Sequence, residues 1–338
     1  MVTQELSLSV CPEIAAILQG LGHESPFVSS LAGTAGSGRH YWRIGERPLG
    51  HIVLASHDGD ADYDRFLHVS QALRRAGLRV PEVYGHQDAV RQVVLEDLGS
   101  SLHLDRMRRR EGKPQEQEAL CLQVVRALGE WQEKGTAAIP ACGWLGDRHF
   151  DVAALRWETD YFMRRYLGDV LGQGEAALHD AELVAEFDAL AGRVANHPQV
   201  LMHRDFQSQN LMWRDGEVWF IDYQGCRWGS LWYDLGSFLW DPYVQLPTDM
   251  RQRLFEAFAR DRGLDPADAW PAFLEASLQR LMQALGAYGF LSRHKGLPWF
   301  SQYLGPGRKL LEGALAAHGG MPCLRAWLEK CPGELAGA

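Results

Sequence analysis

Two acidic residues and one asparagine stand at spacings that suit phosphoryl transfer. In the stretch HRDFQSQNLMWRDGEVWFID, residues 203–222, Asp205 is followed by Asn210 and then by Asp222. Such a transfer needs a carboxylate that positions an acceptor hydroxyl, and hard oxygen ligands that hold a divalent cation against the phosphates. The spacing therefore predicts that Asp205 accepts the proton of a hydroxyl, while Asn210 and Asp222 bind the metal.

The alternative is a polar loop that only caps neighbouring helices, which is the usual role of a single aspartate. The flanking sequence favours the chemical interpretation. The apolar residues 200–202 precede the loop, and residues 218–222 are typical of a strand that ends in Asp222, after a turn at Asp215 and Gly216. A hairpin of this kind brings Asn210 and Asp222 to the same end of two adjacent strands.

The rest of the chain predicts a small α+β lobe followed by a helical lobe. Residues 12–22 and 62–76 have helical spacing, and residues 30–56 indicate two strands with a glycine-rich turn in the first connection and a turn at 45–48 in the second. Residues 80–85 and 91–99 indicate two further strands. Helices are expected near 114–134, 151–168, 177–196, 231–243, 248–262, 266–293 and 305–317. The boundary lies near residue 100, so the lobes are residues 1–100, which would bind nucleotide, and 101–338, which would carry the catalytic loop and the substrate site.

Composition excludes several classes of protein. The formal net charge of the 338 residues is -9, which argues against a nucleic-acid partner, and the basic run at residues 106–110 is followed by glutamates, as on a solvated helix face. The six cysteines form no close pairs, so neither a disulfide framework nor a zinc site is expected. No apolar run approaches ~18 residues, and the first twenty residues lack the basic start of a signal peptide. The sequence predicts a soluble, cytoplasmic protein with no membrane partner.

Four stretches give the chain a family resemblance: SGRHYWR (37–43), AGLRVPEVYG with VLEDLG (76–99), DVAALRWETDYF (151–162), and HRDFQSQNLM with IDYQGCRWGSLWYDL (203–235). With them the sequence resembles the aminoglycoside phosphotransferase family, which has a protein-kinase-like fold. Within that family it is most similar to the bacterial anomeric kinases of N-acetylmuramate and N-acetylglucosamine.

The resemblance implies a two-lobed fold, ATP as phosphoryl donor and Mg²⁺ as cofactor. It implies that Asp205 is the catalytic base and that Asn210 and Asp222 are the metal ligands. Backbone groups of the hinge would meet the adenine edge at Glu96, Asp97 and Leu98. Three further side chains would support the catalytic loop: His203, Arg204 and Asp234.

In one respect the sequence departs from the usual kinase pattern. Many kinases hold the α- and β-phosphates with a lysine on a strand. No lysine precedes Lys113, so either other donors hold the phosphates or the protein does not turn over nucleotide. Arg39 and Arg43 could supply bidentate phosphate contacts, and the backbone N–H groups of Ser37 and Gly38 could add to them.

Two local alternatives exist for these arginines. Arg43 could instead form a surface ion pair with Glu46. Asp62 or Asp64, at the start of the next helix, could pair with Arg39 or Arg43. A glycine-rich turn between strands is by itself weak evidence for a phosphate site.

Acceptor recognition is expected from the helical lobe. Glu158 and Asp160 stand two positions apart on one expected helix, so one of them would face the substrate and the other solvent. Gln207 offers a neutral donor and acceptor, and Trp228 could cover the apolar face of a sugar ring. An acidic sugar would need a cationic partner, for which the sequence offers four arginines without choosing among them: Arg164, Arg165, Arg227 and Arg293.

The sequence therefore predicts a sugar kinase that phosphorylates the anomeric hydroxyl of an N-acetylated hexose, a step in the recycling of cell-wall sugars. The alternatives are a kinase for an aminoglycoside or another small alcohol, and a nucleotide-binding pseudokinase that regulates a partner. The exact acceptor, the phosphorylated position, the choice between ATP and GTP, the residue that replaces the lysine and the oligomeric state stay open.

Overall fold

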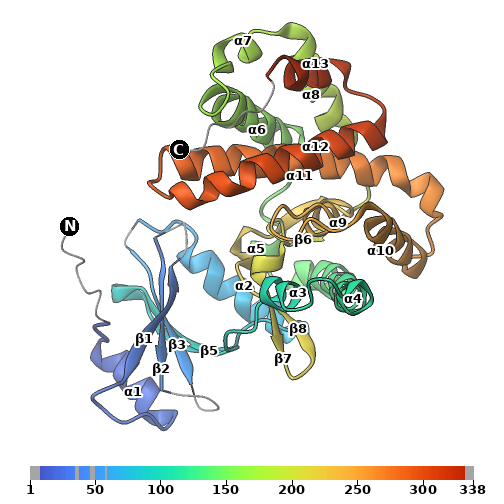
Figure 1. Cartoon of the computed structure of the whole chain (residues 1–338). Helices are drawn as coiled ribbons and strands as arrows, with labels where there is room; N and C mark the ends of the chain where they lie inside the picture. The colour runs from blue at the N-terminus through green and yellow to red at the C-terminus, as the bar shows by residue number, and fades with distance from the viewer. Residues whose placement is uncertain (1–7, 35–37, 46–49, 58, 332–338) are drawn as a thin grey trace. The chain divides into compact units, whose positions relative to one another are not determined.

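The computed structural model describes residues 8–34, 38–45, 50–57 and 59–331, and the chain divides into two compact units (Figure 1). The first unit comprises Met1–Ser101 with Met212–Gln224, and the second comprises Leu102–Leu211 with Gly225–Ala338. The sequence analysis assigned residues 212–224 to the helical lobe, whereas the structure groups them with the N-terminal sheet.

An antiparallel five-stranded sheet, in the order β1-β2-β3-β5-β4, forms the centre of the first unit. Its strands are β1 (Ser29–Thr34), β2 (His40–Ile44), β3 (His51–Ala55), β4 (Val83–Gln87) and β5 (Gln92–Glu96). Residues 30–56 were expected to form two strands and form parts of three. The register places Trp42 opposite Val53, and Val53 opposite Val94, so that their side chains share one face of the sheet.

The core of this unit lies between that face and α1 (Pro12–Gly20). Ile14 and Leu18, one helical turn apart, are fully buried against Trp42, Val53 and Val94. A proline at the first helical position suits the start of α1, because its fixed φ is already helical and it lacks only an N–H that would have no partner.

The hairpin of β7 (Leu211–Arg214) and β8 (Glu217–Phe220) turns at Asp215 and Gly216. Both turn residues have positive φ, 52° and 83°, as a tight two-residue hairpin requires. Backbone bonds attach the hairpin to the first unit: Trp213 N–H donates to the Ser101 carbonyl at 2.8 Å, and Phe220 N–H to that of Arg79 at 2.9 Å. β8 ends at Phe220, so the expected strand through Asp222 is two residues too long.

The second unit is mainly helical. Its longer elements are α3 (His103–Arg108), α4 (Pro114–Ala138), α6 (Val152–Phe162), α8 (Ala181–Ala195), α9 (Tyr233–Leu239), α10 (Thr248–Asp261), α11 (Pro266–Arg293), α12 (Leu304–His318) and α13 (Pro322–Lys330). Shorter helices are α5 (Gly143–Gly146) and α7 (Gly174–Leu178), and one short ladder joins β6 (Gln199–Met202) to β9 (Arg227–Ser230). Helices α3 and α13, which are only six and nine residues long, were not expected from the sequence.

Helix α11 is the central element of this unit and packs against α6, α9 and α12 (Figure 1). The close approach of α11 to α6 and to the turn that follows α6 depends on two glycines. A Cβ on Gly289 would lie 2.4 Å from the Arg165 carbonyl oxygen, and one on Gly286 would lie 3.2 Å from the Phe162 nitrogen. The helix expected over 151–168 is α6 followed by a π-helical turn, Met163–Gly168, at this contact.

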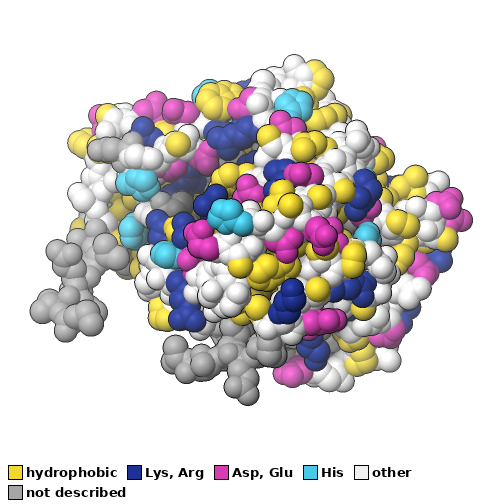
Figure 2. Space-filling model, turned by 90° about the horizontal axis from the view of Figure 1, so that it is seen from above, with side chains coloured by type: hydrophobic (Ala, Val, Ile, Leu, Met, Phe, Trp, Pro, Cys, Tyr) yellow, Lys and Arg dark blue, Asp and Glu magenta, His cyan; other side chains and the backbone are white. Residues whose placement is uncertain are grey.

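The face of the molecule in Figure 2 carries acidic, basic and hydrophobic side chains intermingled, without a broad area of a single charge. Within the described part of the chain, no helix has both the length and the apolar character needed to cross a membrane.

A buried ion pair lies beneath the sheet of the first unit. The Arg39 side chain is 1% exposed, and its guanidinium donates to both carboxylate oxygens of Asp60, at 2.7 and 3.1 Å. The Ser56 hydroxyl donates to the same carboxylate, and the guanidinium packs over the Phe66 ring at 5.5 Å. A buried charge without its partner is strongly destabilising, so each member of the pair depends on the other.

We expect Asp60→Ala to lower the free energy of unfolding by about 3–5 kcal/mol, because Arg39 would keep a buried charge without a counter-ion. Urea denaturation of wild type and variant measures this difference. The control is Glu82→Ala, which removes an exposed ion pair with Arg74 at 3.5 Å and should cost less than about 1 kcal/mol. Equal losses in both variants would contradict the structural role of the buried pair.

Candidate active site

The loop that carries Asp205 begins where the β6–β9 ladder ends. β6 and β9 are antiparallel, with Met202 opposite Arg227, and the chain leaves the ladder at His203. His203 is fully buried against the rings of Trp131 and Phe206, which makes it a core residue that supports the loop. A 3-10 turn, Ser208–Asn210, closes the loop.

Two buried carboxylates hold the backbone of the loop. Asp234, in the first turn of α9, accepts hydrogen bonds from the N–H groups of His203 at 2.6 Å and Arg204 at 2.8 Å. Asp241 accepts one from the Ser208 N–H at 2.8 Å. Burial raises the pKa of Asp234 to about 7 against these donors, which lower it. The sequence analysis assigned a backbone-holding role to Asp234 but did not find Asp241.

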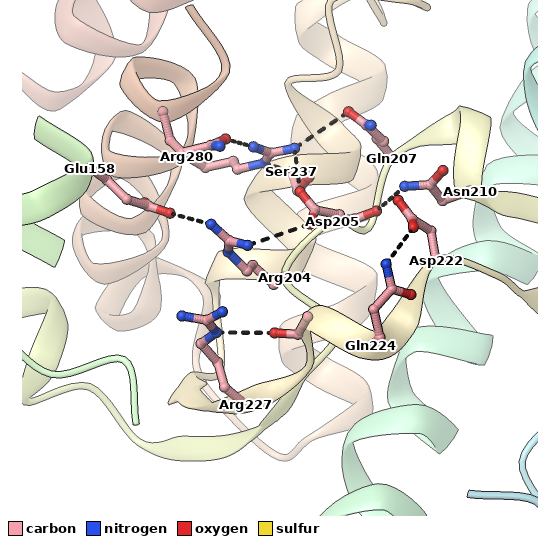
Figure 3. Close-up of polar contacts among 12 residues, drawn as sticks. Glu158, Arg204, Asp205, Gln207, Asn210, Asp222, Gln224, Arg227, Ser237 and Arg280 are labelled. Atoms are coloured by element: carbon pink, nitrogen blue, oxygen red, sulfur yellow. Dashed lines mark hydrogen bonds and ion pairs between the residues drawn. The ribbon is translucent and has the colours of Figure 1, made fainter. Parts of the chain in front are cut away.

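Arg204 is held in an uncommon conformation. Its φ is 79°, a region that costs a non-glycine residue about 1–3 kcal/mol and is frequent at functional sites. Its guanidinium lies 3.7 Å from the carboxylate of Glu158, which also accepts a hydrogen bond from the Tyr233 hydroxyl at 2.9 Å (Figure 3). Glu158, predicted to contact substrate, is only 1% exposed and instead anchors Arg204. Asp160 is 42% exposed and pairs with Arg156.

Asp205 lies between two guanidinium groups. One carboxylate oxygen is 4.0 Å from Arg204 and the other is 3.6 Å from Arg280, while the side chain remains 27% exposed (Figure 3). Burial alone would raise the pKa of Asp205, but the charges of Arg204 and then Arg280 outweigh it and hold the pKa below its ordinary value. The carboxylate is therefore ionised at neutral pH and can accept a hydrogen bond from a hydroxyl.

Arg280 is the functional residue that sequence reasoning missed. It lies in the middle of α11, buried, and bonds the Ser237 hydroxyl at 2.9 Å, the Gln207 side chain at 3.4 Å and the Gln283 side chain. The available signal was an arginine in the mainly apolar middle of α11, because such a residue is rarely buried without a partner.

The amide of Asn210 is oriented by the catalytic loop itself. Its Nδ2 donates to the backbone carbonyl of Asp205 at 2.9 Å, and its own N–H donates to the Gln207 carbonyl at 2.9 Å. The amide oxygen therefore faces away from the Asp205 backbone, and such an oxygen is a suitable ligand for Mg²⁺. The donor set fits a hard divalent cation.

Asp222 belongs to the first unit and is positioned by α2 (Tyr63–Arg75). The two residues after it fix the segment: the Tyr223 hydroxyl bonds that of Ser70 at 2.8 Å, and the Gln224 carbonyl accepts from Arg65 at 2.9 Å. Asp222 has a φ of 62°, and its carboxylate accepts a bond from the Gln224 side chain at 2.8 Å (Figure 3).

The two arginines predicted to hold the phosphates pair with carboxylates in the structure. Ser37 lies outside the described residues, and Gly38 has a φ of 86°. Arg39 pairs with Asp60 as described above, instead of with Asp62 or Asp64. Arg43 donates to both oxygens of Asp97, at 2.7 and 3.1 Å, and to the Gly99 carbonyl at 3.1 Å. Its suggested partner Glu46 is outside the described residues as well.

The segment predicted to meet the adenine edge follows β5. The Glu96 N–H already donates to the Glu82 carbonyl at 2.9 Å, so this donor is not available to a ligand. Asp97 also accepts from the Gly99 N–H at 2.7 Å, and Leu98 is buried. The contacts of Arg43 and Asp97 thus fix the path of the chain at the end of the sheet.

The tryptophans Trp228 and Trp232 differ in their burial. Trp228 is half-buried in β9, with its backbone bonded to residues 148 and 150. Trp232, four residues further along the same motif, is buried between Phe255 and Phe258 and is a core residue.

Comparison with known proteins decides the family. Residues 31–274, which are well over half of the chain, match the model of the phosphotransferase enzyme family. The chain belongs to the phosphotransferase enzyme family. It is a kinase with an alcohol group as acceptor, and the predicted family resemblance is confirmed.

Two relatives match two thirds or more of the chain. The N-acetylmuramate/N-acetylglucosamine kinase of Pseudomonas aeruginosa is 26% identical over 311 residues, which are 88% of this chain and 85% of the relative. The protein of the same name from Neisseria meningitidis is 26% identical over 243 residues, 67% of this chain and 70% of the relative.

Solved structures confirm the predicted α+β, kinase-like fold. A choline/ethanolamine kinase family protein from Mesorhizobium loti aligns with a TM-score of 0.60 at 14% identity, over 94% of this chain and 98% of that one. The ADP-bound aminoglycoside phosphotransferase APH(2'')-Ib aligns with a TM-score of 0.57 at 12% identity, over 89% and 99%.

We expect Arg280→Gln to raise the pKa of Asp205, because it removes one of the charges that oppose the effect of burial. The acidic limb of the pH profile of kcat/KM should then move to higher pH. Arg308→Gln is the matched control: Arg308 is also a buried helical arginine, but it bonds the carbonyls of Leu328 and Cys331. An unmoved limb in Arg280→Gln would contradict the proposed coupling.

Proposed function

We propose that this family member is an ATP-dependent, Mg²⁺-requiring sugar kinase that phosphorylates the anomeric hydroxyl of N-acetylmuramate or N-acetylglucosamine. The observation that carries the phosphoryl-transfer chemistry is the ionised, partly exposed carboxylate of Asp205 on a loop held by buried acceptors. The proposal for the sugar is supported by relatives that match 85% and 70% of their own length and carry these two sugars in their names.

The role of Asp205 follows from its charge and position. The acceptor hydroxyl oxygen forms a bond to the γ-phosphorus of ATP, the bond from that phosphorus to the β–γ bridging oxygen breaks, and ADP leaves. The hydroxyl proton passes to Asp205. Because flanking arginines lower the pKa of Asp205, it is a weak base, and its main contribution is to orient the hydroxyl for attack.

The metal ligands we propose are Asn210 and Asp222. The Asn210 amide oxygen is turned away from the Asp205 carbonyl, and Asp222 is an exposed carboxylate on a fixed segment. When bound, Mg²⁺ would neutralise charge on the phosphates. The segment Glu96, Asp97 and Leu98 remains our proposal for the adenine edge, through its remaining backbone groups.

The substrate assignment predicts that purified protein with ATP and Mg²⁺ releases ADP when N-acetylglucosamine or N-acetylmuramate is added. Choline and gentamicin serve as competing acceptors, since proteins that act on such compounds share the fold. A coupled ADP assay gives kcat/KM for each, and chelation with EDTA should stop turnover. A kcat/KM for choline or gentamicin above that for both sugars would reject the sugar assignment.

Asp205→Asn should lower kcat by about a thousandfold or more, while the dissociation constant for ATP changes by less than about threefold, because the amide keeps the shape of the side chain but cannot accept the proton. Turnover is measured by ADP release and nucleotide binding by calorimetry. The control is Asp188→Asn, whose carboxylate pairs with Arg156 on an exposed surface. A folded Asp205→Asn protein with unchanged kcat would remove Asp205 from the reaction.

A further inference from the structure

Arg227 is held beside the catalytic loop without being neutralised. It is the first residue of β9 and lies opposite Met202, the last residue before the loop. Its Nε donates to the Gly225 carbonyl at 3.0 Å, and its guanidinium packs over the Phe150 ring at 5.6 Å. Within the described residues, no carboxylate forms an ion pair with it. The fork of the guanidinium is therefore fixed, and its terminal nitrogens remain available.

The surroundings of Arg227 have a surplus of positive charge. Figure 3 places Arg227 beside Arg204, and the charges of Arg204 and Arg148 both act on it. The opposing carboxylate is Glu158, which is already bonded to Tyr233 and paired with Arg204. Burial, followed by the like charge of Arg204, lowers the pKa of Arg227 to about 10, so a bound anion would relieve an unfavourable arrangement.

Helix α6, which carries Glu158 of this charged cluster, also carries an aromatic surface. Trp157 precedes Glu158 on α6, is 57% exposed, and stacks on Tyr161 with ring centroids 5.1 Å apart and an interplanar angle of 11°. Tyr161 is near enough to Arg204 for that charge to act on its phenol. An exposed tryptophan ring stacked on a half-buried tyrosine presents a flat apolar surface next to charged groups, which suits one face of a sugar ring.

We propose that Arg227 binds a carboxylate substituent of the acceptor sugar, with the Trp157–Tyr161 pair covering the ring. This inference rests on the proposed sugar-kinase function and adds a preference for hexoses that carry an acidic group. A guanidinium whose plane is fixed by a carbonyl and a ring can donate two parallel bonds to a carboxylate, which a neutral sugar cannot receive in the same way.

The other arginines considered from the sequence fit this role less well. Arg165 already pairs with Asp169 at 3.0 Å and contacts His294. Arg164 and Arg293 are exposed, and no contact with another described residue fixes the plane of either guanidinium. Arg227 is distinguished by having a fixed plane, an adjacent catalytic loop and no counter-ion among the described residues.

The test is the ratio of kcat/KM for N-acetylmuramate, which carries a carboxylate, to kcat/KM for N-acetylglucosamine, which does not. We expect Arg227→Gln to lower this ratio by about tenfold or more, mainly through KM for the acidic sugar, since a charge-assisted bidentate contact is lost. Arg227→Lys should give an intermediate ratio, because it keeps the charge but loses the fork. Arg164→Gln is the matched control and should keep the wild-type ratio.

The outcomes separate the inference from the function on which it rests. If wild type phosphorylates either sugar but the ratio is the same in Arg227→Gln, the carboxylate subsite is rejected and the sugar kinase stands. If wild type phosphorylates neither sugar, the proposed function fails, and the inference fails with it. A fall in the ratio of equal size in Arg164→Gln would show a general effect of surface charge and would also reject the specific subsite.

Discussion

The catalytic loop depends on the burial of the Asp234 carboxylate beneath it. A loop that leaves a short ladder has backbone N–H groups without partners, and such groups must find acceptors when buried. Asp234 accepts two of them, from His203 and Arg204, and Asp241 accepts a third from Ser208. A buried carboxylate is costly without donors, so the loop and the carboxylate stabilise each other. This mutual dependence allows Arg204 to keep a φ of 79° that it would not adopt alone.

The charges around Asp205 are arranged for orientation more than for basicity. Arg204 and Arg280 each lie near one oxygen of the carboxylate and together lower its pKa. A lowered pKa keeps the group ionised but weakens it as a base, so a transfer whose transition state is loose gains mainly from a fixed hydroxyl. Glu158 and Tyr233 extend this network, because they fix Arg204 from the side opposite Asp205.

Local patterns in the sequence predicted the family, the helices with strong periodicity, the turn at Asp215 and Gly216, and the loop around Asp205. Contacts between distant segments could not be predicted in the same way. Arg280 lies 75 positions after Asp205, and Arg39 pairs with Asp60, not with the nearby acidic residues of α2. Helical geometry predicted that Glu158 and Asp160 face different sides, but only the structure reveals that the buried residue, Glu158, pairs with Arg204. Burial and pairing decide such roles, and one sequence carries little information about either.

Besides Arg204, two arginines lie near the catalytic loop, Arg280 and Arg227. They differ in whether their hydrogen-bond donors are already used, and that difference separates their roles. Arg280 is buried and its donors are used by Ser237, Gln207 and Gln283, so its charge acts only on groups already in place. Arg227 has one bond to a carbonyl and an aromatic contact, and its charge adds to that of its neighbours. A surplus of positive charge next to the nucleophile's base repels a polycationic acceptor and attracts an anionic one. A choline kinase and an aminoglycoside phosphotransferase in complex with gentamicin share the fold, so the architecture alone does not select the alcohol, and we expect the sign of the charge beside the loop to do so.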